Sequence, residues 1–259
     1  MVLWGNFTAI HIMSLVFALA VVVALFLSLV NKPRRTQILL LFTISLFIAG
    51  STIYNALTSD NVIQNLPLSL WGFTALLLPY AVLKRKPWVC NLLLLWSVES
   101  ILLLVYNQDK ADMNIFTFEF LGYFLTHIFV AGIPLVMFWL KLVRRDCKYI
   151  QISLIITTLV YTAVHFFNVA FGTNYLYSMN HEGIELFAFF RALIPNDYWY
   201  MFLMIPVFFL YLAWWYFPEI LDERRKRKRL KQRLKSIDKY YDEYEDEYID
   251  EIIEEKYGR

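Results

Sequence analysis

Seven long apolar stretches, separated by short polar connections, follow one another along the first 217 residues of the chain. A helix that crosses a bilayer needs about 20 mostly apolar residues, and each stretch comes close to that length. The third and seventh stretches are the shortest. The pattern predicts an all-α, polytopic membrane bundle of seven transmembrane helices, near residues 8–30, 37–57, 66–83, 88–106, 115–140, 149–172 and 201–217.

The connections between these segments alternate in charge, and this alternation predicts how the bundle is oriented. Three connections are strongly basic, and the others hold only Lys110 and Arg191. Basic connections stay on the cytoplasmic side of a membrane. We therefore expect a multi-pass protein of the cell membrane with its N-terminus outside and its C-terminus inside. The basic residues are Lys32, Arg34, Arg35, Lys84, Arg85, Lys86, Lys141, Arg144, Arg145 and Lys148.

The connection 173–200 is too apolar for an ordinary polar loop. Its middle, 184–193, is apolar with Glu185 and Arg191 interspersed, and the aromatic run 198–200 closes it. Aromatic residues of this kind collect at membrane interfaces. The pattern predicts a short outer interfacial helix. This helix either caps the outer mouth of the bundle or rests on the lipid surface.

The chain changes character after Pro218, and we divide it there into a transmembrane domain, 1–218, and a charged cytoplasmic tail, 219–259. Twelve of the 24 basic and 13 of the 22 acidic residues follow Phe217, basic first and acidic afterwards. Such runs are usually solvated helix or disorder. The alternative interpretation of the tail is that residues 224–259 dock a cytoplasmic protein partner, with Ile249, Ile252 and Ile253 as a small apolar stripe. No nucleic-acid-reading module accompanies the basic block, so we expect no nucleic-acid partner.

Composition agrees with a membrane protein and excludes several enzyme classes. Hydrophobic residues make up 59% of the chain, and the mean hydropathy of +0.50 lies outside the usual soluble range. The two cysteines, Cys90 and Cys147, flank basic connections and are predicted to be thiols in a reducing compartment. The sequence has no metal-type Cys/His spacing and no glycine-rich phosphate loop. We therefore expect neither a metal nor a cofactor.

Several polar residues interrupt the apolar segments, and they are the candidates for a functional site. Polar groups at membrane depth are costly unless they face a bundle interior or a wet cavity. His165 and Asn168 are three residues apart and so share one helical face. We predict a polar ligand-binding or lipid-binding site lined by His11, Glu99, Glu119, His165, Asn168, Asn174 and Tyr175. The alternative for each residue is a satisfied interhelical hydrogen bond.

His127 is deep in the fifth segment and is the candidate general base. Its neighbour Thr126 points in a different direction, so a nucleophilic hydroxyl would have to come from another segment. Ser69 is one candidate, because the preceding Asn-Leu-Pro places it at a helix start, where unpaired N–H groups could polarise a carbonyl. The alternative is a helix start exposed to interfacial water.

Four motifs resemble, in order and spacing, the YwaF family of bacterial integral membrane proteins, which is related to transmembrane protein 164 of animals. They are NLPLSLWGF, FEFLGYFLTHIFV, HFFNVAFGTNYLY and LIPNDYWYMFLM; FTAIHIMSLVFAL also fits, with His11 in the family's early histidine position. The resemblance covers approximately residues 7–217, and Gly172, Asn174 and Tyr175 are its most specific part.

The resemblance implies a seven-span bundle and, for the animal relatives, an acyl transferase that uses a cysteine and a histidine. The family histidine matches His127. The family motif LPLHLC reads LPLSLW here, so Ser69 stands at the histidine position and Trp71 at the cysteine position. Tryptophan cannot be an acyl nucleophile. Ser69 is about 200° round the helix from Trp71, whereas Thr74 shares the face of Trp71 better.

Three functions stay open on these residues. The loss of the cysteine and the unusual tail favour a scaffold or partner-recruiting protein with a degenerate catalytic site. The second is a protein that binds or transports a ligand or membrane lipid. The third is a lipid-acting ester hydrolase or acyltransferase that uses His127 with Ser69 or Thr74.

Overall fold

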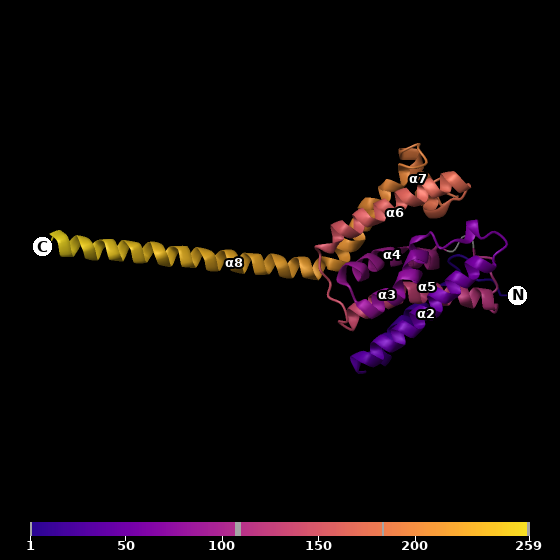
Figure 1. Cartoon of the computed structure of the whole chain (residues 1–259), viewed down its shortest axis with the longest axis horizontal. Coiled ribbons are helices and arrows are strands. Elements are labelled where there is room, and N and C mark those ends of the chain that lie inside the picture. The colour runs from indigo at the N-terminus through magenta and orange to yellow at the C-terminus, as the bar shows by residue number, and fades with distance from the viewer. Residues whose placement is uncertain (1, 107–109, 183, 258–259) are drawn as a thin grey trace. The chain divides into compact units, whose positions relative to one another are not determined.

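The protein is all-helical over the residues that the structure describes (Figure 1). The structure, a computed structural model, describes the backbone of residues 2–106, 110–182 and 184–257. It describes their side chains as far as residue 237, except at 223, 227, 231 and 236. The long helices are α1 (Ala9–Val30), α2 (Arg34–Thr58), α3 (Leu70–Lys84), α4 (Pro87–Val105), α5 (Phe118–Trp139), α6 (Tyr149–Phe171) and α8 (Met204–Tyr257); shorter ones are η1 (Ile63–Asn65), η3 (Tyr175–Tyr177), α7 (Glu185–Leu193) and η4 (Tyr200–Leu203).

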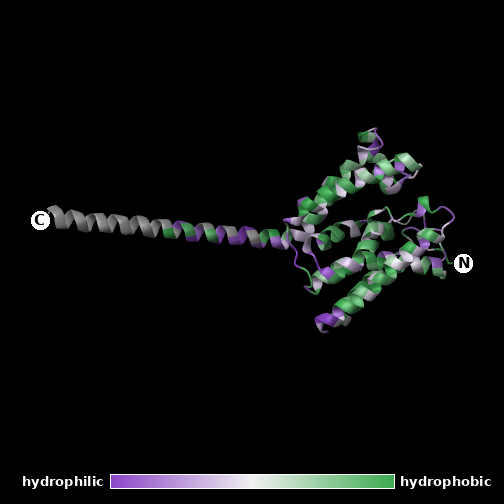
Figure 2. Ribbon diagram, viewed as in Figure 1, coloured by the Kyte–Doolittle hydropathy of each residue, from purple (hydrophilic) through white to green (hydrophobic). Residues whose placement is uncertain are grey.

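Six segments in the described part of the chain are helical, long and apolar enough to cross a membrane. They are α1, α2, α4, α5, α6 and the segment 200–235, which includes the first part of α8 (Figure 2). The ends of α1, α2, α4, α5 and α6 lie within three residues of the predicted ends. The chain is therefore a multi-pass membrane protein.

The third predicted segment forms the shorter helix α3, which has 15 residues instead of the 18 expected for 66–83. Its start is set by Ser69, whose Oγ accepts a hydrogen bond from the Gly72 N–H, so Leu66 to Leu68 stay outside the helix. Gly72 is required there, because a Cβ would lie 2.7 Å from the Pro67 carbonyl oxygen. A 15-residue helix is about 22 Å long, shorter than the roughly 30 Å hydrocarbon core of a bilayer.

The chain divides into two compact units, Met1–Ala213 and Trp214–Arg259. In the first unit α4 and α5 are mostly buried, whereas α1, α2 and α6 expose most of their side chains. Leu92 to Leu95 of α4 are almost completely buried and form part of the core. Helix α5 packs on α1 and α4, and α4 packs also on α3 and α6. The exposed apolar faces of α1, α2 and α6 have the character of lipid-facing surfaces.

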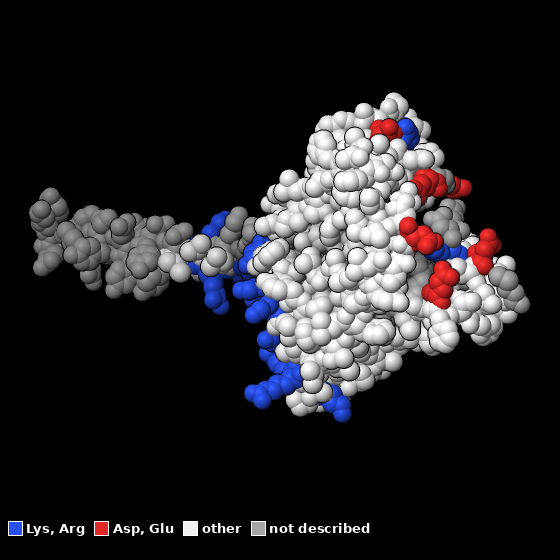
Figure 3. All heavy atoms as spheres, turned by 45° about the vertical axis from the view of Figure 1, so that its right-hand side comes forward, with Lys and Arg blue, Asp and Glu red and all other residues white. Residues whose placement is uncertain are grey.

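Basic and acidic side chains lie at opposite ends of the first unit (Figure 3). Most Lys and Arg side chains gather at one end and most Asp and Glu side chains at the opposite end. The basic connections α1–α2, α3–α4 and α5–α6 all lie at one end because consecutive long helices run in opposite directions. On the face shown, the surface between the two ends is almost free of Lys, Arg, Asp and Glu side chains.

Over the residues that the structure describes, the second unit is one continuous helical segment of α8. The seventh predicted segment was expected to end at Phe217, but helix α8 continues through Pro218 to Tyr257. The residues that follow Pro218 are rich in Glu, Arg, Lys and Leu, which are good helix formers. Of the predicted partner-docking region 224–259, the part beyond residue 237 lies outside the described side chains.

Candidate functional site

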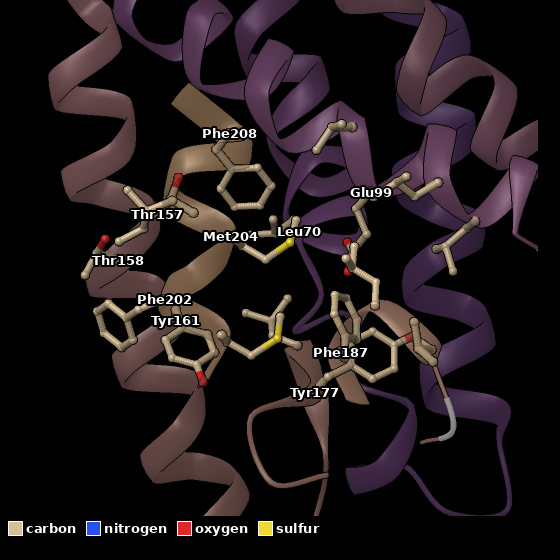
Figure 4. Close-up of a pocket in the computed structure, with 18 of the residues that line it drawn as sticks. Leu70, Glu99, Thr157, Thr158, Tyr161, Tyr177, Phe187, Phe202, Met204 and Phe208 are labelled. Atoms are coloured by element: carbon tan, nitrogen blue, oxygen red, sulfur yellow. The ribbon is translucent and has the colours of Figure 1, made fainter. Parts of the chain in front are cut away.

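A cavity of about 400 Å³ in the first unit is the candidate functional site (Figure 4). Residues from α3, α4, α6, α7, η4 and α8 line it, together with the segment between α6 and α7. The lining is mainly aliphatic and aromatic, as in most small-molecule sites. Its wall includes Leu70, Glu99, Tyr161, Tyr177, Phe187 and Met204.

Glu99 of α4 is the only Asp, Glu, Lys, Arg or His among the described residues that line the cavity. One of its carboxyl oxygens, Oε2, accepts a hydrogen bond of 2.6 Å from the Trp71 backbone N–H. Trp71 lies in the first turn of α3, where N–H groups lack partners inside the helix. A carboxyl group is favoured at such a helix start. Glu99 therefore lies between the start of α3 and the cavity.

Two hydroxyl groups on the opposite wall of the cavity, those of Thr157 and Tyr161, are already hydrogen-bonded (Figure 4). Thr157 of α6 accepts a hydrogen bond from the Trp96 indole N–H and donates one to the Ser153 carbonyl oxygen. The Tyr161 hydroxyl donates to the Tyr198 carbonyl oxygen at 2.8 Å. Thr157 and Tyr161 lie across the cavity from Glu99. Glu99 is thus the group best suited to bind a polar head of a ligand.

Helix α7 and the segments beside it cover one side of the cavity with aromatic rings. Phe187 packs on Tyr177 with ring centroids 5.0 Å apart, and Phe187 belongs to a core cluster with Phe190, Tyr200 and Met204. The Tyr200 hydroxyl donates to the Tyr177 carbonyl oxygen. The predicted short helix thus exists, and its Phe187 contributes to the wall of the cavity.

His127 of α5 is buried, with 2% of its surface exposed. Its Nδ1 lies 2.8 Å from the Tyr123 carbonyl oxygen; because that oxygen can only accept, Nδ1 carries the proton. Nε2 is therefore the basic nitrogen, and it has no hydrogen-bond partner in the described structure. The ring of Trp71 packs against the imidazole, with centroids 4.9 Å apart.

The two candidate hydroxyls lie close to Trp71 in the chain but do not bond to His127. Ser69 Oγ accepts from the Gly72 N–H at 3.1 Å, and the Thr74 hydroxyl donates to the Leu70 carbonyl oxygen at 2.7 Å. Both hydroxyls have local roles in α3. In the described structure, no hydroxyl forms a nucleophile–base hydrogen bond with His127 Nε2.

Asn168 and His165 do share a face of α6, and the structure uses them to hold the turn that follows this helix. The buried Asn168 amide donates to the Tyr175 carbonyl oxygen and to Ser178 Oγ, and it accepts from the Thr173 hydroxyl and the Tyr175 N–H. His165 Nδ1 lies 3.1 Å from Ser178 Oγ. The sequence analysis did not identify Ser178 as the partner of His165 and Asn168. The only indication in the sequence is that Ser178 follows the turn after α6.

The other predicted site residues also have local partners. His11 Nδ1 accepts from the Phe7 N–H, and its Nε2 donates to the Leu104 carbonyl oxygen. The Asn174 amide closes the loop that reaches Asn180. The Tyr175 hydroxyl donates to the Ile63 carbonyl oxygen, and burial raises the pKa of this phenol.

Glu119 is exposed in the first turn of α5. Of the predicted ligand-binding residues, Glu99 lines the cavity. The apolar majority of the wall was not anticipated, because its residues come from elements that are distant in sequence. The described residues contain no group of three or more His, Cys, Asp or Glu side chains that could hold a metal ion.

Comparison with known proteins agrees with the motifs in α3, α5 and α6. A family model described as the TMEM164 family matches residues 5–216. The search of curated proteins and the search of solved structures found no match. The family match covers the transmembrane part, including the cavity, Glu99, Trp71 and His127, and ends before the charged tail. The chain belongs to the TMEM164 family.

Proposed function

We propose that this protein binds an amphipathic ligand, with an apolar chain in the cavity and a hydrogen-bond-donating head group at Glu99. The observation that carries the proposal is a single carboxyl group in the otherwise uncharged wall of a cavity of about 400 Å³. This volume falls in the usual range for small-molecule sites, about 300–1,000 Å³. An apolar wall with one polar anchor matches a molecule that has one chain and one polar end.

The observed contacts favour binding over the catalytic alternative. The basic nitrogen of His127 has no hydrogen-bond partner in the described structure, and the Trp71 ring packs against its imidazole. Ser69 and Thr74 stabilise the first turns of α3 instead. The scaffold alternative depends on residues 224–259, whose acidic part, from Asp238 onward, lies beyond the described side chains. Neither alternative has an observation comparable to the cavity.

The binding proposal includes a topology. We propose that α3 is a seventh, short span and that the basic end of the first unit faces the cytoplasm of a cell membrane. The sorting of charge between the two ends supports this orientation. Leu70 at the start of α3 and the residues of α7 that line the cavity would then lie in the outer half of the bundle.

Ligand-dependent thermal stabilisation of the purified protein tests the binding proposal. Test ligands share one saturated chain and differ in the head group: an amine, an alcohol or a carboxylate. We expect the amine and the alcohol to stabilise the fold, whereas the carboxylate has no proton to donate to Glu99. Glu99→Gln should weaken amine binding about fivefold, because a hydrogen bond to a charged group is roughly twice as strong as a neutral one of about 1 kcal/mol.

Two substitutions in α8 separate binding in the cavity from adsorption to the apolar surface. Met204→Trp replaces a flexible side chain of the cavity wall with a bulky ring. The ring would fill part of the cavity, so this change should abolish stabilisation by every ligand. Leu210→Trp is the matched control, because Leu210 is 67% exposed and does not line the cavity. Equal binding of the carboxylate and the amine, or a Met204→Trp variant that binds normally, would refute the proposal.

A further inference from the structure

The part of α8 beyond Phe217 carries a concentrated positive charge. Nine of the twelve residues from 224 to 235 are Lys or Arg, and none of the residues from 224 to 237 is acidic. We call residues 224–237 the basic segment. Every side chain of the basic segment that the structure describes is exposed. The ion pair between Asp222 and Lys226 is itself exposed, so it neutralises little of this charge.

The basic segment also has an apolar face. Leu230, Leu234 and Ile237 follow one another at intervals of four and three residues, which places them on one side of a helix. Their exposed fractions are 59%, 51% and 49%. A helix with an apolar stripe flanked by Lys and Arg is the type that lies in the interface of an anionic membrane.

We propose that the basic segment binds the anionic lipid surface on its own side of the membrane. Its cations match the phosphate and carboxylate groups of such lipids, and its three apolar side chains match the outer edge of the acyl region. The segment begins seven residues after Phe217, about 10 Å along the helix. It is therefore close to the lipid head groups from the start.

Pro218 is the position in α8 where the bend that this docking requires would form most easily. Proline has no N–H, so it cannot donate to the carbonyl oxygen of Trp214, four residues earlier in α8. The helix is therefore weakest between its apolar part and the basic segment. Bending there turns the basic segment from the direction of the span toward the membrane plane.

The charge pattern disfavours a second copy of this chain as the partner. Two basic segments side by side in register would place nine cations beside nine others, and like charges at such distances repel. In the sequence the sign reverses after Ile237, with Asp238 and the acidic run that follows. An anionic surface repels that run, so the contact with lipid ends with the basic segment.

The test uses the full chain in nanodiscs, with a fluorophore on Ile237→Cys in a Cys90→Ala, Cys147→Ala background. Nanodiscs of phosphatidylcholine are compared with nanodiscs that also contain phosphatidylserine, and quencher-labelled lipid reports contact with the acyl region. We expect quenching only with phosphatidylserine, and its loss at high salt because salt screens the attraction. Each cation removed in an Arg225→Gln, Arg229→Gln, Arg233→Gln series should weaken surface association about fivefold.

The matched control is a Glu243→Gln, Glu245→Gln, Glu247→Gln variant, which removes the same number of charges from the acidic run and should not weaken quenching. Equal quenching in both lipid compositions would overturn the proposal, as would an unchanged signal in the Arg series. Self-quenching between labelled copies without lipid quenching would also overturn it, because that result identifies a second copy as the partner.

Discussion

Replacing Asn168 with alanine should destabilise the fold without changing which ligands bind. The side chain is buried and forms four hydrogen bonds with Thr173, Tyr175 and Ser178. A hydrogen bond contributes about 1 kcal/mol to stability, so the loss of all four predicts a cost of about 4 kcal/mol. Asn168→Asp keeps an oxygen acceptor and loses the two N–H donors, which predicts about 2 kcal/mol.

The assay for this prediction is reversible denaturation of the purified protein in detergent, with tryptophan fluorescence as the signal. The neighbouring residue Val169 is 58% exposed, and Val169→Ala is the control, with an expected change below about 0.5 kcal/mol. The ligand panel is then repeated on each variant at a temperature where it is folded. An Asn168→Ala protein as stable as the control but unable to bind ligand would show that Asn168 is a ligand residue instead.

Two further predictions concern packing and topology. Gly132→Ala should destabilise the protein by about 1 kcal/mol or more, because the new Cβ would lie 2.7 Å from Val22 Cγ2; Gly122→Ala in the same helix meets open space and should stabilise by roughly 0.5–1 kcal/mol. Both changes are read by the same denaturation assay, and equal effects would refute the close contact between α1 and α5. A membrane-impermeant maleimide should label Cys147 only after the membrane is permeabilised, while the buried Cys90 stays unlabelled; labelling of Cys147 in intact cells would reverse the proposed orientation.

The helices could be predicted from hydropathy because a spanning segment must satisfy its own backbone and present apolar side chains to lipid. Those requirements are local, and the ends of five helices follow them within three residues. The start of α3 depends on Ser69 and on the close approach of Gly72 to Pro67. A hydropathy window cannot detect that cap, so the predicted segment began at residue 66 instead of residue 70.

The site was harder to predict because periodicity gives the direction of a side chain and not its partner. His165 and Asn168 were correctly placed on one face, but their partner Ser178 comes from the turn after α6. Glu99 was recognised as an unusual polar group. The cavity beside it depends on Phe187 and Met204, which are ordinary apolar residues in sequence. Only the packing of distant elements brings them to Glu99.

Trp71 connects the two polar groups that sequence and structure both single out. Its backbone N–H binds Glu99, while its ring packs on His127. The first contact joins the start of α3 to a side chain that lines the cavity, and the second places an unreactive ring next to the imidazole. A cysteine at this position would have a thiol near the histidine; tryptophan removes that chemistry but keeps the start of α3 and its carboxyl partner. The proposed binding function therefore rests on the cavity beside Glu99.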